Sequence, residues 1–205
     1  MKISLLLVQI REMQFLYIIM TIFAVSGSAS AADIRSSVTL TDLSEGKRTT
    51  LGLYPSPADA ASALRADPSI LFLDVRDPIE INFIGVPVSV DAIVPFLIVK
   101  HETDRKKGTY KPAPNSRFVT DLNAATARNG FGKNHPIFVM CRSGDRSAKA
   151  ADIIAKAGYR SVWSLVEGFE GDKDKAGKRT VNGWRNAGLP WTYKLTLDQA
   201  WVPSK

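Results

Sequence analysis

Short apolar runs that alternate with stretches of helical spacing are the feature that most constrains the fold of this chain. The run Ile70–Val75 is long enough for a strand buried on both faces and too short for a helix. Ile137–Cys141 and Ser161–Val166 are runs of the same kind. Buried strands separated by helices are typical of a parallel sheet with helices on its faces. The sequence therefore predicts an α/β fold with an open, mainly parallel sheet flanked by helices.

Capping residues mark where two helices begin or end. Ser56 is a candidate N-cap and Pro57 a candidate first helical residue, which predicts a helix that continues through Arg65. A second helix is predicted over residues 118–128, because Asn129-Gly130 follows it in the manner of a C-cap.

Other predicted elements have less distinct signals. They are a helix over residues 148–157, a strand within residues 86–93 and a short helix around residues 184–186. Because of Pro87, the strand is expected to begin late or to lie at an irregular edge. Residues 99–118 are predicted to form a long polar loop, since Pro112 and Pro114 interrupt any regular pattern. Such an insertion either covers a site, docks a protein partner or is a plain solvated loop.

The N-terminus has the order of a signal peptide. Lys2 and Arg11 precede the apolar run Phe15–Val25, and small residues follow up to Ala31. The run is shorter than the about 20 residues that cross a bilayer core. We therefore expect cleavage after Ala31 and export, to the periplasm, with no membrane anchor left after cleavage. The alternative is an uncleaved anchor.

Composition fits one globular domain. The chain has 205 residues, of which 45% are hydrophobic and 23% charged, so it can bury a core without disulfides or structural metal. Its formal net charge of +7 is compatible with small anionic substrates. The basic residues form no stripe interleaved with aromatics, so nucleic acid is not an expected partner.

The single cysteine, Cys141, stands where a predicted strand meets a predicted helix. This is the sheet edge at which open α/β proteins usually bind ligands. Free backbone N–H groups, the positive end of the helix dipole and the charges of Arg142 and Arg146 would all favour a thiolate and attract anions. Asp145 places a negative charge in the same loop and should oppose both effects to some degree. A buried structural cysteine is the alternative.

The length of this loop favours sulfur chemistry over phosphate hydrolysis. A cysteine phosphatase would have its arginine at position 147, where this chain has Ser147, whereas Arg146 comes one residue earlier. The smaller ring of amides should suit the outer sulfur of a persulfide better than a tetrahedral phosphoryl group.

Four segments together resemble the rhodanese family of sulfurtransferases. They are Cys141–Ser147, which is similar to the active loop of single-domain rhodaneses, Leu73–Arg76 with Glu80, Val166–Glu170, and Gly183-Trp184 with Ala187–Pro190. After Glu80 the family usually shows Gly-His-Ile-Pro-Gly-Ala, and this chain departs from that pattern at residues 85–91. The resemblance covers residues 55–192. Together with the N-terminal pattern, it predicts a signal peptide over 1–31, an extension over 32–54, a rhodanese-like domain over 55–192 with an insertion at 99–118, and a tail over 193–205.

The resemblance implies a function and roles for the loop. Cys141 would take the sulfane sulfur of thiosulfate or a related small anionic donor, hold it as a persulfide and pass it to cyanide, a thiol or a protein acceptor, with no metal or organic cofactor. The implied catalytic residue is Cys141, and the implied substrate-binding residues are Arg142, Ser143, Gly144, Asp145, Arg146 and Ser147. The resemblance also implies a structural role for Asp74 and Arg76, paired near the loop or with Glu80. The alternative function is a rhodanese-fold binding or sulfur-carrier module that docks a periplasmic partner.

Overall fold

The computed structural model describes residues 34–204, so the expected signal peptide lies outside the described residues. In chain order the elements are η1 (Leu40–Asp42), η2 (Glu45–Lys47), α2 (Pro57–Ala66), β1 (Leu71–Asp74), α3 (Pro78–Ile84), β2 (Val86–Pro87), β3 (Ala92–Ile93), β4 (Leu97–Asp104), β5 (Thr109–Pro114), α4 (Phe118–Arg128), β6 (Ile137–Met140), α5 (Asp145–Lys156), β7 (Val162–Ser164) and β8 (Trp191–Thr192).

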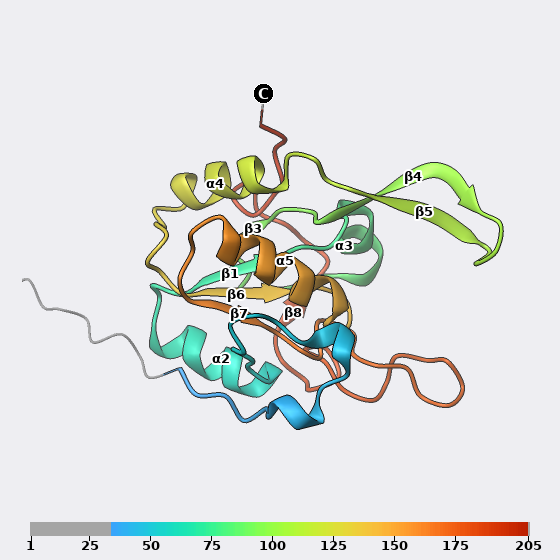
Figure 1. Cartoon of the computed structure of the whole chain (residues 1–205), viewed down its shortest axis with the longest axis horizontal. Helices are drawn as coiled ribbons and strands as arrows, with labels where there is room; N and C mark the ends of the chain where they lie inside the picture. Colours follow the sequence, from blue (N-terminus) through green and yellow to red (C-terminus); the bar gives the residue numbers. More distant parts are fainter. Residues whose placement is uncertain (1–33, 205) are drawn as a thin grey trace, which may run out of the picture. The chain divides into compact units, whose positions relative to one another are not determined.

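A four-stranded parallel sheet in the order β3-β1-β6-β7 forms the centre of the fold (Figure 1). Strands β1 and β6 lie side by side in register, with Leu71 opposite Ile137 and Asp74 opposite Met140. Because the strands are parallel, the segments that follow Asp74 and Met140 leave the sheet at the same edge. The predicted α/β fold with a mainly parallel sheet is confirmed.

Alternating side chains of the strands supply two cores, one on each face of the sheet. Leu71, Leu73 and Val139 face the core beneath α4 and α5. Phe72 and Phe138 face the opposite core, which contains residues of α2, α3 and the segments near β2 and β8. Both faces are therefore buried, which explains why the strands read as continuous apolar runs.

Two helices begin with a capping box, in which the N-cap and the third helical residue bond each other's backbone. In α2 these residues are Ser56 and Asp59, as the predicted helix start requires. In α3 they are Asp77 and Glu80, with Pro78 at the first helical position. Helix α3 was not predicted, although its start carries the same signal.

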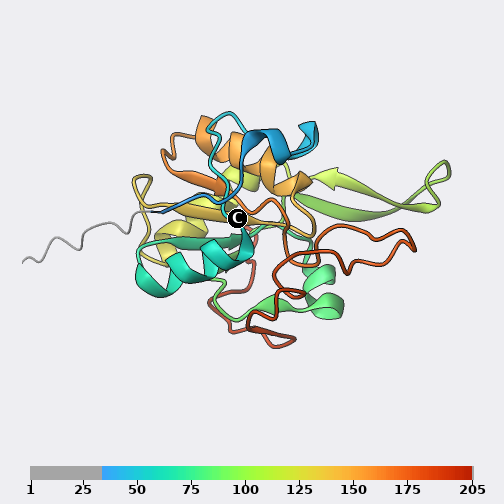
Figure 2. The same cartoon turned by 90° about the horizontal axis from the view of Figure 1, so that it is seen from below.

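The segment predicted as a polar loop at 99–118 is mostly a β-hairpin, β4–β5, which projects from the rest of the domain (Figure 2). Asp104 begins the connecting turn, and its carboxylate accepts hydrogen bonds from the backbone N–H groups of Lys106 and Lys107. Pro112 and Pro114 are tolerated because a two-stranded ribbon leaves every other N–H unpaired. The prediction of an irregular loop is wrong because an exposed hairpin needs no apolar alternation.

The C-terminal region differs from the sequence prediction in one element. The short helix expected around 184–186 is a series of turns. Trp184 is buried against Phe72, with ring centroids 5.1 Å apart. Trp191 pairs with Pro87 in the β2–β8 ladder, so Pro87 lies in a small antiparallel pair outside the main sheet. In the described part of the chain, no helix combines the length and the apolar character needed to span a bilayer.

Candidate functional site

Cys141 follows the last residue of β6 and is almost fully buried, with 1% of its surface exposed. Only three residues separate it from α5, which begins at Asp145 rather than at Ala148 as the sequence predicted. The first turn of the helix therefore lies within the predicted site loop. The described structure thus places the cysteine at the carboxyl edge of the sheet and directly before a helix N-terminus.

Backbone and hydroxyl groups surround the Cys141 sulfur. The N–H of Gly144 donates to Sγ at 3.2 Å, and Sγ lies 3.6 Å from Oγ of Ser147, which is buried in the first turn of α5. Ser147 in turn donates to the carbonyl of Gly144 at 2.8 Å and accepts from Ser164 of β7 at 3.1 Å. This chain of hydrogen bonds fixes the arrangement of the groups around the Cys141 sulfur, which we call the cradle. Ser164 belongs to this arrangement, although the sequence analysis did not identify it.

Gly144 is the residue on which the cradle depends most. Its φ of +103° is a conformation that L side chains rarely adopt, and a Cβ here would lie 2.1 Å from the carbonyl oxygen of Val166. The backbone turns sharply at this point so that the Gly144 N–H faces the sulfur. No residue with a side chain fits this position without displacing the 166–168 turn.

A turn from Val166 to Glu170 holds the site loop from outside. The N–H of Phe169 donates to the carbonyl of Cys141 at 2.8 Å, and the N–H of Glu170 donates to the carbonyl of Arg142 at 3.0 Å. Gly168 allows this close approach, since a Cβ there would meet the backbone of the loop at 2.6 Å. The Val166–Glu170 segment that resembles the family therefore supports the loop that contains Cys141.

Arg146 is joined to α3 by a bidentate ion pair with Glu80. Its Nη1 and Nη2 donate to Oε2 and Oε1 at 2.6 and 2.8 Å. Burial alone would raise the pKa of the Glu80 carboxyl, but the hydrogen bond and charge of Arg146 hold that pKa below its usual value. Burial would lower the pKa of Arg146, but Glu80 and, next, the charge of Cys141 raise it. Arg146 is thus a cation that Glu80 holds in the first turn of the helix that follows Cys141.

Arg142 has a different arrangement. Its Nε donates to Oε2 of Glu170 at 2.5 Å, and Arg185 donates to Oε1 of the same carboxylate at 2.6 Å. Among the described residues, no acceptor contacts the two Nη groups of Arg142, and its side chain is 40% exposed. It is therefore the arginine of the loop that has donors available for an incoming anion.

Asp74 and Arg76 form a fully buried pair at the end of β1. Arg76 Nη2 lies 2.6 Å from Asp74 Oδ2, and Nη2 also donates to the carbonyl of Gly85 at 2.9 Å. Of the two pairings left open by the sequence, the one between Arg76 and Glu80 does not form. The guanidinium carbon of Arg76 lies 4.3 Å from the ring centroid of Phe169, so this pair supports the turn that holds the site loop.

The remaining loop residues, Ser143 and Asp145, lie at the outside of the loop. Asp145 is exposed, and its carboxylate accepts a hydrogen bond from Ser143 Oγ at 3.3 Å. Its Oδ1 would be 3.2 Å from a Cβ at Gly46, so it lies next to η2. In the first turn of α5, an acidic side chain is favoured by the helix dipole.

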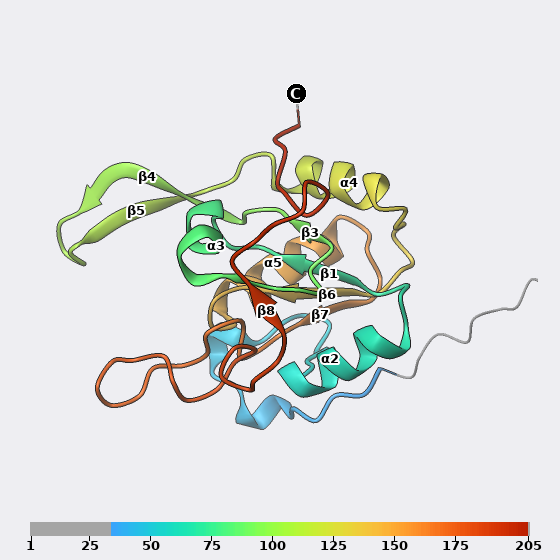
Figure 3. The ribbon, with the colours of Figure 1, turned by 180° about the vertical axis from the view of Figure 1, so that it is seen from behind.

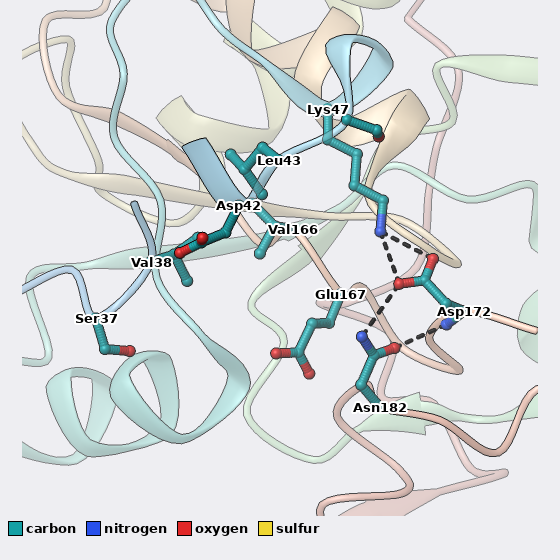
Figure 4. Close-up of a pocket in the computed structure, with 10 residues that line it drawn as sticks. Ser37, Val38, Asp42, Leu43, Lys47, Val166, Glu167, Asp172 and Asn182 are labelled. Atoms are coloured by element: carbon teal, nitrogen blue, oxygen red, sulfur yellow. Dashed lines mark hydrogen bonds and ion pairs between the residues drawn. The ribbon is translucent and has the colours of Figure 1, made fainter. Parts of the chain in front are cut away.

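Residues 34–54 pack beside the site loop and line a polar pocket of about 510 Å³ (Figure 4). Lys47 extends across this pocket to Asp172 at 2.9 Å, and Asn182 donates to the same carboxylate. The extension thereby ties the segment after the 166–170 turn to the domain. Within residues 34–204, no group of three or more His, Cys, Asp or Glu side chains could hold a metal ion.

The fold and the site define a class of protein: an α/β domain in which a buried cysteine lies between a parallel strand and a helix N-terminus, where its sulfur accepts a hydrogen bond from a backbone amide. The family model described as a rhodanese-like domain matches residues 56–175, which is more than half of the chain. The chain therefore belongs to the rhodanese-like family, a sulfurtransferase-type family.

Individual proteins and structures are similar to parts of the chain. A crystal structure of Rv0390 from M. tuberculosis is 30% identical, with a TM-score of 0.53, and the match covers 68% of this chain and 96% of that one. The thiosulfate sulfurtransferase GlpE of Actinobacillus succinogenes is 29% identical over 42% of this chain and 68% of its own length. The uncharacterized protein RP600 of Rickettsia prowazekii is 43% identical over 28% of this chain. That match spans only 42% of the length of the Rickettsia protein.

Proposed function

We propose that the protein moves sulfane sulfur from thiosulfate or a related anionic donor to cyanide or a thiol through a persulfide on Cys141. The observation that carries this proposal is the position of the Cys141 sulfur, which faces the Gly144 N–H at 3.2 Å directly before α5. Amides before a helix N-terminus stabilise negative charge, and a persulfide places that charge on its outer sulfur. The likeness to the GlpE sulfurtransferase supports the same reaction class.

In the first step, the Cys141 thiolate attacks the sulfane sulfur of thiosulfate. A new S–S bond forms, the bond between the two sulfurs of thiosulfate breaks, and its electron pair leaves with sulfite. In the second step, cyanide or a thiolate attacks the outer sulfur of the persulfide, and the electron pair of that S–S bond returns to Cys141 as thiolate. The product is thiocyanate or a new persulfide, and no external oxidant or reductant is consumed.

The two arginines have separate parts in this reaction. Arg142 uses only Nε on Glu170, so its Nη groups can bind the oxygens of the anionic donor. Arg146 uses both Nη groups on Glu80, and it acts as a fixed positive charge near the sulfur. Of the two arginines that the resemblance implies as substrate-binding residues, Arg142 is thus the one that binds and orients the donor.

Steady-state kinetics test the two-step reaction. The initial rate is measured against thiosulfate concentration at several fixed concentrations of cyanide. A covalent intermediate gives parallel lines in the double-reciprocal plot, the pattern of a ping-pong mechanism. We expect Arg142→Lys to raise the KM for thiosulfate more than that for cyanide, and Cys141→Ser to abolish turnover. Thiocyanate formation by folded Cys141→Ser protein would exclude the proposed mechanism.

We also propose that the protein is exported to the periplasm after cleavage at Ala31. The support is the order of charged, apolar and small residues over 1–31. N-terminal sequencing of the protein recovered from the exported fraction should begin at Ala32. Recovery of the chain only in the cytoplasm, with its first residues intact, would contradict export.

A further inference from the structure

Three exposed segments project at the edge of the sheet where β6 ends and Cys141 lies. They are α3, the β4–β5 hairpin and the segment 171–185, and Figures 1 and 3 show all three on the side toward which β6 points. We refer to them together as the carboxyl-edge face. None of the three carries a residue that performs the proposed chemistry.

A strongly basic pocket of about 550 Å³ opens on this face next to the catalytic loop. Its charged lining residues are Arg142, Glu170, Lys173, Lys178, Arg179 and Arg185. Glu170, the acidic member, already has one oxygen on Arg142 and the other on Arg185. The pocket therefore has an excess of positive charge, and a negatively charged occupant would relieve the repulsion.

Among the described residues, the acidic residues of the segment 171–185 form no ion pair with its lysines. Asp172 is taken by Lys47 and Asn182, and Asp174 accepts from the N–H of Lys178 and from Thr180 Oγ1. By contrast, the exposed lysines of the segment make no ion pair among the described residues; these are Lys173, Lys175 and Lys178. The internal hydrogen bonds thus leave the positive charges of this segment unpaired toward solvent.

An exposed apolar pair lies on α3, the helix of the carboxyl-edge face. Ile79 is 51% exposed and Phe83 is 78% exposed, and their i,i+4 spacing places them on one face of the helix. The same helix carries Glu80, which holds Arg146 of the site loop. Asp77 at its start accepts a hydrogen bond from the N–H of Val99 of β4. The apolar pair is therefore close to both the catalytic loop and the base of the hairpin.

From this arrangement we propose that the carboxyl-edge face docks an acidic protein segment whose thiol exchanges sulfur with Cys141. The basic pocket receives carboxylates of the partner, and Ile79 and Phe83 contact an apolar side chain near its cysteine. Exposed apolar residues rimmed by charge mark protein interfaces, whereas a small inorganic anion could not contact both regions at once. This proposal rests on the persulfide function proposed above.

The transfer step needs no further reactant. The thiolate of the partner attacks the outer sulfur of the Cys141 persulfide and forms a new S–S bond. The bond between that sulfur and Cys141 breaks, and its electron pair restores the Cys141 thiolate. The partner leaves as a persulfide.

Two synthetic peptides of equal length test the docking surface. Both have a Leu-Cys-Leu centre, one flanked by glutamates and the other by lysines, and the rate of sulfur transfer from persulfide-loaded protein is measured for each. At low salt, we expect the acidic peptide to react about tenfold faster, and this preference to shrink as salt screens the charges.

Variants locate the preference on the surface. Lys173→Glu combined with Lys178→Glu should bring the ratio of acidic to basic peptide rates to about one, and Phe83→Ser should slow both peptides. The matched control is Arg160→Glu combined with Lys194→Glu, which changes the net charge equally at exposed positions outside the carboxyl-edge face. The control should keep the preference of the wild type.

The outcomes separate the two proposals. If the persulfide forms and cyanide removes it, but wild-type protein does not distinguish the peptides, the docking proposal is wrong and the proposed function stands. A preference that survives in the Lys173→Glu, Lys178→Glu protein likewise overturns the docking site. If no persulfide forms, the proposed function is wrong, and the docking proposal that rests on it is wrong as well.

Discussion

Arg146 donates to both carboxylate oxygens of Glu80, at 2.6 and 2.8 Å, although the two residues are 66 positions apart in the chain. One comes from the first turn of α5 and the other from α3. The pair therefore connects the helix that carries the site loop to a helix that follows a neighbouring strand. It holds the loop and its positive charge in place before any substrate arrives.

Breaking this pair should destabilise the protein measurably. Glu80→Gln leaves a mostly buried guanidinium with a neutral partner, and we expect a loss of about 2 kcal/mol in the free energy of unfolding by urea denaturation. Glu102→Gln is the control, because Glu102 is 76% exposed and its ion pair with Lys111 is long, with 3.7 Å between Nζ and Oε2. Its cost should stay within about 0.5 kcal/mol. Equal costs for the two variants would show that the Glu80 pair has no special structural role.

The contribution of Glu80 should depend on pH in a defined direction. Its pKa is lowered in the folded protein: burial opposes this, but Arg146 outweighs it. A carboxyl with a lowered folded pKa stabilises the protein above its unfolded pKa, and this stability is lost as pH falls through the folded value. The stability difference between wild type and Glu80→Gln should therefore shrink as pH falls below about 4. A difference that stays constant down to acid unfolding would contradict this assignment.

Asp91 should show the opposite behaviour. Burial raises the pKa of its carboxyl, and the hydrogen bond that it accepts from the Phe72 N–H at 2.7 Å opposes this only in part. A raised folded pKa means stability that is present below the unfolded pKa and lost as pH rises. Asn can accept the same hydrogen bond without charge, so Asp91→Asn should be equal to wild type or up to about 1 kcal/mol more stable at pH 7. The gain should vanish at low pH in denaturation curves, and a clear loss of stability at pH 7 would refute this explanation.

Gly144→Ala tests the shape of the cradle. The new Cβ would lie 2.1 Å from the Val166 carbonyl oxygen, so the loop and the turn must separate. We expect a loss of more than about 3 kcal/mol in unfolding free energy. Gly130→Ala is the matched control: its φ is +77° and a Cβ there has open space. It should lose only about 1 kcal/mol and keep the proposed reaction of Cys141 with thiosulfate. Similar losses at both glycines would mean that backbone conformation alone, and not the contact with Val166, matters.

The sequence predicted those elements whose signals are local. Capping residues define α2 and the end of α4, and buried apolar runs define β1 and β6. The hairpin β4–β5 was missed because its strands are exposed on both faces, so no alternation of apolar and polar residues marks them. Helix α3 was missed although Asp77, Pro78 and Glu80 carry a capping box, because the segment is short and has no long apolar period.

For the site, the sequence indicated the cysteine, the loop and the two arginines. It could not assign their partners, because Glu80 and Glu170 approach the loop only through the tertiary fold. Ser164 donates a hydrogen bond to the Ser147 hydroxyl. In the sequence, it is one residue of an apolar run that predicts a buried strand, and nothing there distinguishes it from its neighbours. Contacts of this kind depend on which strands are neighbours, and that order is not encoded in any local pattern.

Intact mass spectrometry of the protein after incubation with thiosulfate tests the central claim most directly. We expect wild-type protein to gain about 32 Da, the mass of one sulfur, and to lose it on addition of cyanide, while Cys141→Ser gains nothing. An unchanged mass of folded wild-type protein with thiosulfate and with other sulfane-sulfur donors, or an equal gain by Cys141→Ser, would contradict a persulfide on Cys141.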